Sequence, residues 1–283
     1  MKTGVIGLGA MGYGMAMNFH KAGSLHRVWN RTRANAETFA AETGTGIAAS
    51  PGELARDCEL VLTCVSRDAD VLEMIESVAP ALGAGNTVID TSTTSSATAR
   101  RAAAMLSEHH ALFLDAPVSG GVEGARNGTL AMMVGGDGQL LDRLRPVLQA
   151  IAGNIVHIGP VGSGQACKAV NQIMCAGINQ AVTEALAFGE RMQLDMNQVI
   201  DVVATGAAGN WFLQHRGRTM VNGVFKPGFK VSLHHKDLNI CTDMSAEPLP
   251  LCDMTLSHYQ DLMDQGFGDE DISALYRLKR PLP

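Results

Sequence analysis

The fold is decided by the first stretch of the chain, Thr3-Gly4-Val5-Ile6-Gly7-Leu8-Gly9-Ala10-Met11-Gly12. A short apolar run ends in a G-x-G-x-x-G motif, and a helical pattern follows to about Ala22. In this context Gly7 allows a tight turn, Gly9 lets the backbone approach a pyrophosphate, and Gly12 lets helix and strand pack closely. An ordinary glycine-rich turn is the alternative. The order of strand, motif and helix favours a dinucleotide-binding loop whose free amides bind phosphates.

Strand-like and helix-like segments alternate after this motif. The further strands expected are His26–Trp29, Leu60–Cys64, Thr87–Ile89, Leu112–Leu114, Leu130–Val134 and Ile155–Ile158. The helices expected between them include Ala34–Glu42, Ala69–Val78 and Ala97–His109. This alternation predicts an α/β domain over residues 1–162, with a Rossmann-type doubly wound, mostly parallel sheet. Ligands of such sheets bind beyond the carboxyl ends of the strands.

Strand signals nearly vanish beyond residue 192. A link rich in Gly and Pro at 159–165 precedes Ala166–Met192, which is long, mostly apolar and free of proline, as in a buried helix. Further helices are expected at Gln198–Ala204, Trp211–Met220, Leu233–Ala246 and Cys252–Gly266. We therefore expect an all-helical domain over 163–283 that begins with a long interdomain helix, and a catalytic cleft where the two domains meet.

Composition excludes several classes of protein. The 283 residues are 46% hydrophobic and 18% charged, with a net charge of −6, which is typical of a folded soluble protein and argues against a nucleic-acid partner. The six cysteines are scattered without a C-x-x-C motif, as in a reduced protein. The chain enters a strand at once, and no apolar run could span a bilayer. We expect a cytoplasmic protein without a membrane partner. The adjacent His234 and His235 point to different sides of a helix, so we expect no metal site.

The second strand ends at Asn30-Arg31-Thr32-Arg33. A dinucleotide fold commonly places an Asp or Glu here to bind the ribose hydroxyls, and that carboxylate would repel a 2′-phosphate. Asn30 carries no charge, while a guanidinium such as that of Arg31 can bind a phosphate in a bidentate manner. A turn with solvated arginines is the alternative. The segment predicts NADP(H) in preference to NAD(H), with NAD(H) still possible.

Three further segments follow strands where ligands are expected. Val65-Ser66-Arg67 and Asp90-Thr91-Ser92-Thr93 could contact the nicotinamide half of a cofactor, although Ser and Thr after strands are also common helix caps. In Asp115-Ala116-Pro117-Val118-Ser119-Gly120-Gly121, a hydroxyl and two glycines offer donors for a carboxylate or a phosphate. Gly124, Gly128 and Thr129 are expected to extend this irregular stretch. A long glycine loop without a ligand is the alternative.

Lys168 is the candidate reactive group. It lies on the long apolar helix and forms a polar stripe with Asn171, Gln172, Cys175 and Asn179, and no Asp or Glu occurs between Asp142 and Glu184. A lysine in water is almost fully protonated at neutral pH, and burial in an apolar cleft would lower its pKa and make it a usable base. Asn171 or Gln172 could orient its ammonium or a substrate oxygen. A solvated surface charge is the common alternative.

Taken together, these residues resemble the β-hydroxyacid dehydrogenase family, which includes 3-hydroxyisobutyrate dehydrogenase, tartronate semialdehyde reductase and glyoxylate/succinic semialdehyde reductases. The resemblance covers nearly the whole chain. The segments that carry it are Gly7–Gly12 with Met15–Asn18, Asp115–Gly121, Gly162–Gln165 with Lys168 and Asn171, Lys236-Asp237-Leu238, and Gly268–Ala274. On composition alone, Lys236-Asp237 is more simply a surface ion pair.

The resemblance implies a fold similar to 6-phosphogluconate dehydrogenase and a hydride transfer between NAD(P) and a small β-hydroxy acid or its semialdehyde. It implies that Lys168 is catalytic together with Asn171 and Gln172. By the same resemblance the substrate carboxylate would be held by Ser119, Gly120 and Gly121, and the cofactor and substrate cleft would be lined by Thr93, Lys236 and Asp237. Asn171-Gln172 is similar to tartronate semialdehyde reductases.

Three questions stay open at this point. The segment Trp29-Asn30-Arg31-Thr32 instead resembles the NADPH-using glyoxylate/succinic semialdehyde reductases, so the substrate is undecided. A catalytically silent dinucleotide-binding scaffold would be expected to lose Lys168, and an imine reductase on the same architecture usually replaces it, so the retained lysine favours a dehydrogenase. The helical domain predicts a homodimer or a homotetramer.

Overall fold

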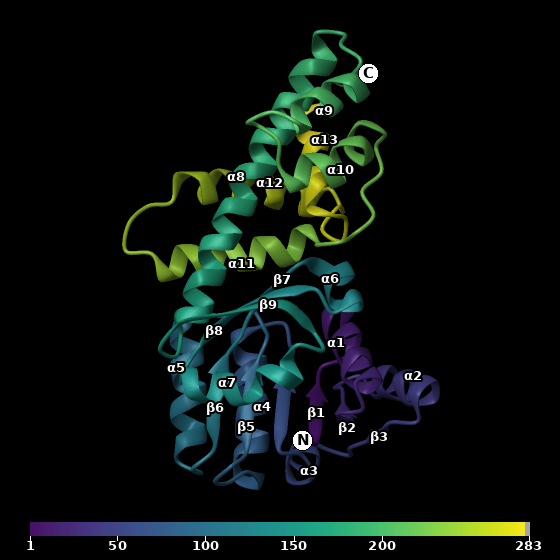
Figure 1. Cartoon of the computed structure of the whole chain (residues 1–283). Helices are drawn as coiled ribbons and strands as arrows, with labels where there is room; N and C mark the ends of the chain where they lie inside the picture. The colour runs from purple at the N-terminus through teal and green to yellow at the C-terminus, as the bar shows by residue number, and fades with distance from the viewer. Residues whose placement is uncertain (281–283) are drawn as a thin grey trace. The chain divides into compact units, whose positions relative to one another are not determined.

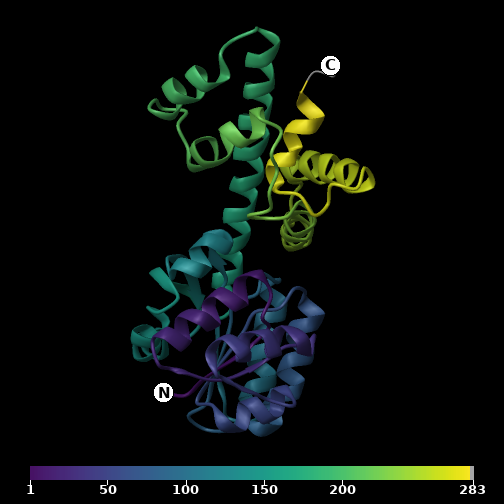
Figure 2. The same ribbon diagram turned by 90° about the vertical axis from the view of Figure 1, so that its right-hand side faces the viewer.

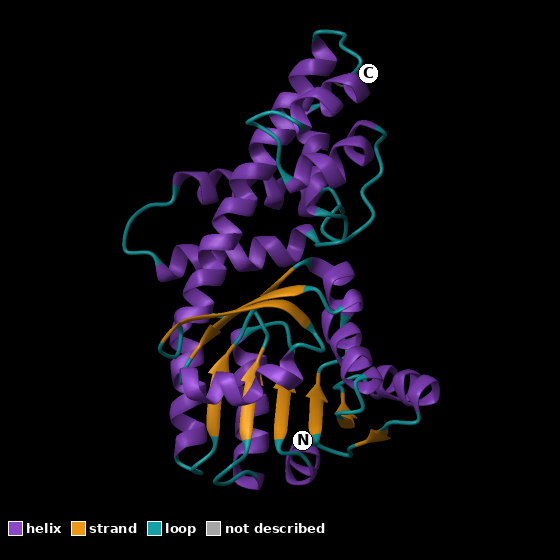
Figure 3. Ribbon diagram, in the orientation of Figure 1, coloured by secondary structure: helices purple, strands orange, loops and turns teal. Residues whose placement is uncertain are grey.

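The computed structural model describes residues 1–280 and divides into two compact units, of which the first is Met1–Lys168 and the second begins at Ala169. The described strands all belong to the first unit, and the second consists of helices and loops (Figure 3). The α/β fold followed by a helical region is as the sequence predicted. The predicted division at 162/163 precedes this contact boundary by six residues.

The first unit is built on one sheet of nine strands in the order β3-β2-β1-β4-β5-β6-β8-β7, with β9 paired to β8 (Figure 1). The strands are β1 (Thr3–Ile6), β2 (Leu25–Trp29), β3 (Gly46–Ile47), β4 (Leu60–Thr63), β5 (Thr87–Asp90), β6 (Leu112–Asp115), β7 (Val118–Ser119), β8 (Leu130–Gly135) and β9 (Ala152–Gly159). The pairs from β3 to β6 are parallel, while β8 runs antiparallel to β6 and β7. The carboxyl ends of β1, β4, β5 and β6 therefore share one edge.

Helices cover both faces of this sheet because apolar side chains alternate along its strands. The helices are α1 (Ala10–Lys21), α2 (Arg33–Thr43), α3 (Pro51–Asp57), α4 (Asp68–Val78), η1 (Ala79–Ala81), α5 (Ser96–Ser107), α6 (Gly121–Asn127) and α7 (Gly138–Leu148). On one face, Val5, Leu62 and Ile89 pack in a core with residues of α1, α2 and α7, and on the other Val61 and Val88 pack with residues of α3, α4 and α5. A doubly wound sheet results.

The second unit surrounds the long helix α8 (Ser163–Arg191), which starts in the first unit (Figure 2). Its other helices are α9 (Met196–Ala204), α10 (Trp211–Val221), α11 (Val231–Met244), α12 (Pro250–Asp264), η2 (Ile272–Leu275) and α13 (Tyr276–Lys279). Tyr259 and Tyr276 are fully buried in its core with Met220, Val231 and Leu262. Within residues 1–280, no helix combines the length and the apolarity that crossing a membrane requires.

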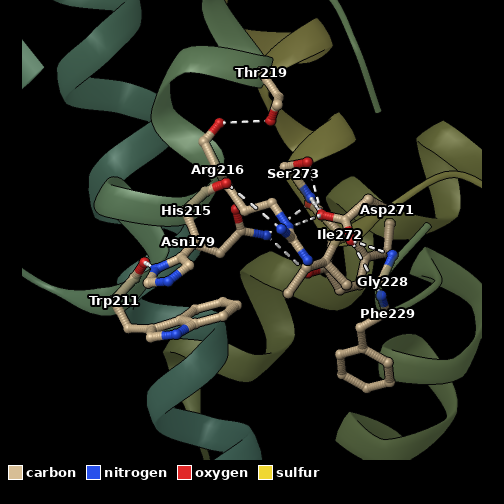
Figure 4. A network of polar contacts seen from close by, with 11 residues as sticks. Asn179, Trp211, His215, Arg216, Thr219, Gly228, Phe229, Asp271, Ile272 and Ser273 are labelled. Atoms are coloured by element: carbon tan, nitrogen blue, oxygen red, sulfur yellow. Dashed lines mark hydrogen bonds and ion pairs between the residues drawn. The ribbon is translucent and has the colours of Figure 1, made fainter. Parts of the chain in front are cut away.

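Asp271 joins three segments of the second unit (Figure 4). Its carboxylate is 1% exposed and accepts hydrogen bonds from the amides of Gly228 and Phe229 and from the amide and hydroxyl of Ser273. Arg216 of α10 forms an ion pair with it, with Nε 3.4 Å from Oδ1. This one carboxylate therefore fixes the loop before α11, the start of η2 and the helix α10.

Two local expectations were wrong. The helix expected from Ala166 begins at Ser163. The buried carboxylate of Asp115, at the end of β6, accepts the amide of Gln165 and so satisfies a free amide of the first helical turn. The stretch expected to be irregular from Gly121 to Thr129 contains the helix α6, which ends at Gly128 in a left-handed conformation with φ of 68°. The short elements β3, β7 and α3 were not predicted, since two to seven residues carry too little periodicity.

Candidate functional site

The glycine loop after β1 depends on close backbone approach. Gly7 has φ of +96°, and a Cβ on Gly12 would lie 1.9 Å from the carbonyl oxygen of Gly7. A Cβ on Gly9, in contrast, would have no heavy atom of the described residues within 4 Å beyond its chain neighbours. Gly7 and Gly12 are thus needed by the fold of the turn, whereas Gly9 leaves space in front of the loop.

A cavity lies in front of this loop. It has a volume of about 430 Å³ and is lined by Leu8, Gly9, Ala10, Tyr13, Asn35 and Thr38. In the described chain, α1 begins at Ala10 without a side-chain cap and without an acidic residue in its first turn. The first amides of α1, which include those of Ala10, Met11 and Gly12, are therefore available to an anion, and the partial positive charge of the helix start favours one. The residues present suit a pyrophosphate.

Asn30 holds the glycine loop in place. Its Oδ1 accepts a hydrogen bond from the amide of Leu8 at 2.7 Å, and its Nδ2 donates to the carbonyl oxygen of Thr32 at 2.8 Å. The side chain therefore links the loop after β1 to the turn after β2. An aspartate could make the first bond but not the second. The two hydrogen bonds therefore favour asparagine over aspartate at position 30, apart from any effect of charge.

Arg31 lies in the same turn and is already engaged. Its Nη2 is 2.6 Å from Asp70 Oδ1 and 3.2 Å from Glu73 Oε2, both on α4. Arg33 pairs with Glu37, one turn further along α2, at 2.9 Å. The two arginines that the sequence offered to a phosphate are thus surface cations with carboxylate partners.

The loops after β4 and β5 are tied together at the carboxyl edge of the sheet. The hydroxyl of Ser92 accepts from the amide of Val65 at 2.9 Å and donates to Asp90 Oδ1 at 2.6 Å. Asp90 is fully buried and also accepts from the hydroxyl of Thr63. Burial raises the pKa of Asp90 above its ordinary value, although these hydrogen bonds oppose the shift. Val65, Ser66 and Thr93 consequently lie on loops that one buried polar cluster positions.

Asp115 at the end of β6 holds the start of α8. Its Oδ1 accepts from the amide of Gly162 at 2.7 Å, and its Oδ2 accepts from the amide of Gln165 at 3.0 Å. Burial raises the pKa of this carboxyl, and the backbone amides act in the opposite direction. A Cβ on Gly164 would lie 2.4 Å from the carbonyl oxygen of Met133, so the first turn of α8 packs directly on the sheet backbone.

Gln165 connects this turn to the loop after β5. It is 1% exposed; its Oε1 accepts from the amide of Thr94 at 3.1 Å, and its Nε2 donates to the carbonyl oxygen of Ser92 at 2.8 Å. These bonds bracket Thr93, a candidate cofactor residue. The segment around Thr93 is therefore hydrogen-bonded to the first turn of α8.

Lys168 is placed by the same turn. It is 7% exposed, and its Nζ donates a hydrogen bond of 2.9 Å to the carbonyl oxygen of Val118. Val118 directly precedes Ser119, and the chain then turns through Gly120 and Gly121 with φ of 132° and 63°, values that favour glycine. The structure thus brings Lys168 beside the predicted substrate loop. The expectation of a solvated lysine is excluded by its burial.

The candidate residues of the second unit form a separate hydrogen-bonded chain. The carboxylate of Asp237, 4% exposed, binds Lys236 Nζ at 2.8 Å and accepts from Gln172 Nε2 at 2.6 Å. Gln172 Oε1 in turn accepts from Asn171 Nδ2 at 2.7 Å. The ion pair that composition favoured for Lys236-Asp237 is present, but it does not lie on the open surface, because Asp237 is buried. In the described residues, no group of three His, Cys, Asp or Glu is arranged to hold a metal ion.

Comparison with known proteins agrees with these features. Residues 2–159 match the family described as the NAD binding domain of 6-phosphogluconate dehydrogenase. Residues 162–279 match the one described as NAD-binding of NADP-dependent 3-hydroxyisobutyrate dehydrogenase. The chain belongs to the β-hydroxyacid dehydrogenase family.

Two relatives illustrate this membership. The 2-hydroxy-3-oxopropionate reductase of Escherichia coli is 35% identical over 97% of this chain and 96% of its own length. The structure of the 3-hydroxyisobutyrate dehydrogenase of Mycobacterium tuberculosis with L-serine has a TM-score of 0.89 at 34% identity, covering 99% of both chains. An imine reductase from Myxococcus stipitatus, at 19% identity and a TM-score of 0.67, shares the fold.

For this β-hydroxyacid dehydrogenase family member, the sequence analysis placed the residues that position the site inside candidate segments but assigned them no role of their own. Asp90, Asp115 and Gln165 carry no proposed chemistry, yet their hydrogen bonds hold the loops of the candidate residues. One signal was available: two Asp residues end the apolar strands β5 and β6, where a charge is costly unless the fold satisfies it. Asp70 and Glu73 gave no signal, because their contact with Arg31 is long-range.

Proposed function

We propose that the protein is an NAD(P)-dependent oxidoreductase that transfers hydride between the cofactor and a small β-hydroxy acid or its semialdehyde. The observation that carries this proposal is the buried amine of Lys168, hydrogen-bonded to Val118 immediately before the Ser119 loop. An amine held at such a place can exchange a proton with a substrate oxygen. The substrate types considered are 3-hydroxyisobutyrate, tartronate semialdehyde, glyoxylate and succinic semialdehyde.

Lys168 acts as the general acid and base in this proposal. A nicotinamide cofactor, when bound, accepts or supplies the hydride. In alcohol oxidation the neutral amine of Lys168 takes the hydroxyl proton, and in carbonyl reduction its ammonium returns a proton to the forming alkoxide. The carbonyl oxygen of Val118 can accept from either form and so fixes the direction in which the amine points.

The substrate carboxylate is assigned to Ser119, Gly120 and Gly121. A hydroxyl and backbone amides are compact donors, which suits a short acid better than a phosphorylated sugar. The Mycobacterium tuberculosis relative was solved with L-serine, whose hydroxyl lies on the carbon β to its carboxylate. Efficient turnover of a sugar phosphate, with none of three- to five-carbon acids, would contradict this assignment.

We assign cofactor binding to the loop from Gly7 to Gly12. Val65, Ser66 and Thr93 are assigned to the nicotinamide half of the cofactor. We propose that NADP(H) is preferred over NAD(H), because Asn30 is neutral and the Arg31 guanidinium can meet a 2′-phosphate. One charge-assisted contact should raise the affinity for NADPH by roughly 10- to 100-fold. Arg31→Ala should therefore raise the dissociation constant of NADPH much more than that of NADH.

The proposed site residues also include Asn171, Gln172, Lys236 and Asp237. Asp237 holds Lys236 and Gln172, so its replacement by Ala should disturb both side chains at once. We assign Asn171 and Gln172 to catalysis, Asp237 to substrate binding and Lys236 to both ligands. Single Ala variants of Asn171 and Lys236, compared for kcat and KM, test the assignments separately.

We further propose that the chain forms a homodimer or a homotetramer. α8 exposes large apolar side chains at Val170, Met174, Ile178 and Phe188, beside a surface cavity of about 520 Å³ lined by Gly177, Ala181 and Ala185 among others. A second copy would remove this surface from water. Light scattering at micromolar concentration should show more than one chain per particle, and Met174→Asp should shift the particle toward the monomer.

The decisive experiment follows cofactor oxidation or reduction with a panel of small semialdehydes and β-hydroxy acids. A dehydrogenase turns over at least one of them, whereas a silent scaffold binds NADPH without turnover of any. An imine reductase would act on cyclic imines and leave the acids unchanged. Cofactor binding, measured in parallel by calorimetry, separates a failed substrate choice from a chain that binds no dinucleotide.

A further inference from the structure

Two carboxylates of α4 hold the guanidinium of Arg31 through one nitrogen. Asp70 Oδ1 lies 2.6 Å and Glu73 Oε2 lies 3.2 Å from Nη2. The two acids are three residues apart on the helix and therefore share one of its faces. Arg31 itself follows β2, about forty residues earlier in the chain. The fold thus brings two negative charges to the cation assigned to a cofactor phosphate.

The two acids differ in their surroundings. The side chain of Asp70 is 18% exposed and forms the shorter contact, while that of Glu73 is 63% exposed. A partly buried, short ion pair is ordered more strongly than an exposed one, which solvent and salt weaken. Asp70 is therefore the main anchor of the guanidinium, and Glu73 adds charge with little orientation.

We propose that Asp70 and Glu73 are specificity-determining residues that limit the preference for NADP(H) over NAD(H), an inference that rests on the proposed role of Arg31. A 2′-phosphate carries close to two negative charges and would have to approach Arg31 beside both carboxylates. They repel it and compete for the same guanidinium, whereas the 2′-hydroxyl of NAD(H) meets neither penalty. The two acids lower the affinity for NADPH selectively.

Amide substitutions isolate the charge. In Asp70→Asn and Glu73→Gln an oxygen remains that can accept from Arg31 Nη2, so the guanidinium keeps an anchor while the negative charge is lost. We expect each substitution to tighten NADPH binding by about 2- to 5-fold and the double variant by about 10-fold, the scale of single exposed charges. The NADH dissociation constant should change by less than about 2-fold, since NADH has no 2′-phosphate.

The experiment measures dissociation constants of NADPH and NADH by calorimetry at low salt, without turnover. 2′,5′-ADP and 5′-AMP serve as cofactor halves that differ by the 2′-phosphate. Glu76→Gln is the matched control, because Glu76 is an exposed acid of the same helix, three residues beyond Glu73. Glu76→Gln changes the net charge by the same amount as either single amide substitution and should leave NADPH affinity within about 2-fold of the wild type. The gain of the double variant should shrink as salt is added.

Three results would overturn the proposal: unchanged or weaker NADPH binding by the double variant, an equal gain for NADH, or an equal gain in Glu76→Gln. Glu73→Gln, on an exposed side chain, keeps the test valid if Asp70→Asn folds poorly. Arg31→Ala distinguishes the proposed role of Arg31 from that of the two acids. If it weakens NADPH selectively while the amide variants gain nothing, the acids are irrelevant and the role of Arg31 stands. If it affects both cofactors equally, both proposals fail.

Discussion

Lys168 Nζ lies 2.9 Å from the carbonyl oxygen of Val118, and this contact joins α8 to the segment that begins the Ser119 loop. The acceptor is a backbone atom, so no side-chain substitution at residue 118 can delete it. The position of the amine depends instead on the path of the backbone and on the first turn of α8. Asp115 and Gln165 fix that turn, and they are positioning residues for the lysine.

Replacing Lys168 by Ala should lower kcat by roughly 10²- to 10⁴-fold, the usual contribution of general acid–base catalysis. The dissociation constant of NADPH should stay near that of the wild type, because the glycine loop does not involve the lysine. Lys168→Arg should not restore turnover, since a guanidinium does not give up a proton near neutral pH. Stopped-flow turnover and calorimetric binding measure the two quantities separately.

Lys226→Ala is the matched control for that prediction, because Lys226 is an exposed lysine of the second unit. It should keep wild-type turnover. Near-normal turnover of Lys168→Ala would show that the buried amine is structural and would remove the proposed mechanism.

Gly9→Ala should separate cofactor binding from folding. The added Cβ would meet no heavy atom of the described residues within 4 Å beyond its neighbours, so the melting temperature should not fall. The methyl group would occupy the space assigned to the pyrophosphate, and NADPH affinity should drop by at least about 10-fold, since backbone approach is what glycine provides in this motif. Thermal unfolding and calorimetry on the same sample give both values.

Gly83→Ala is the corresponding control, since a Cβ there also meets nothing within 4 Å in the described structure and the loop before β5 is remote from the motif. Neither its melting temperature nor its NADPH affinity should change. If Gly9→Ala bound NADPH as well as this control, the pyrophosphate would not lie against Gly9.

The sequence predicted the doubly wound sheet, the helical second region and the segments that carry the candidate site, because these rest on local patterns. The strand–glycine–helix order at β1 and the long apolar pattern of α8 are such patterns. The polar stripe of α8 was also visible, since Lys168, Asn171 and Gln172 are fixed by helical spacing.

What the sequence could not predict are contacts between distant segments. Asp115 accepts amides of residues about fifty positions away, and Asp237 binds Gln172 across 65 positions. The bonds of Asp115 stabilise the start of α8, and the bond to Gln172 satisfies the buried carboxylate of Asp237. The partners of Arg31 are of the same kind: charge alone predicted a free phosphate-binding guanidinium, while the fold supplies two carboxylates beside it.

Asp271→Ala should destabilise the second unit by about 3–5 kcal/mol, because it deletes a buried carboxylate that satisfies several donors and leaves Arg216 without this ion pair. Trp211 reports on this unit, since Arg216 lies 5.4 Å from the centre of its ring (Figure 4). Urea unfolding followed by fluorescence in a Trp29→Phe background measures the loss. Asp269→Ala, which removes the 85%-exposed partner of Lys230, should cost less than about 1 kcal/mol. Similar losses in both variants would mean that the buried network adds nothing specific.

The buried carboxyl of Asp90 should make the free energy of unfolding depend on pH in a definite direction. Burial raises its pKa above 3.8 in the folded chain, so the native state holds the proton more readily than the unfolded state does. The contribution of Asp90 to the free energy of unfolding is therefore complete below about pH 3.8 and is lost as pH rises through the native pKa. Asn does not titrate. The unfolding free energy of the wild type minus that of Asp90→Asn should therefore fall as pH rises above about 3.8, by about 1.4 kcal/mol for each pH unit that separates the native pKa from the unfolded one.

The chain has two tryptophans, Trp29 and Trp211, so a Trp211→Phe background confines the fluorescence signal to the first unit, where Asp90 lies. Asp142→Asn serves as the control, because that side chain is 74% exposed and the corresponding difference should be nearly independent of pH. A difference that rose with pH for Asp90→Asn would have the opposite cause. It would show that the hydrogen bonds from Thr63 and Ser92 stabilise the Asp90 anion by more than burial penalises it.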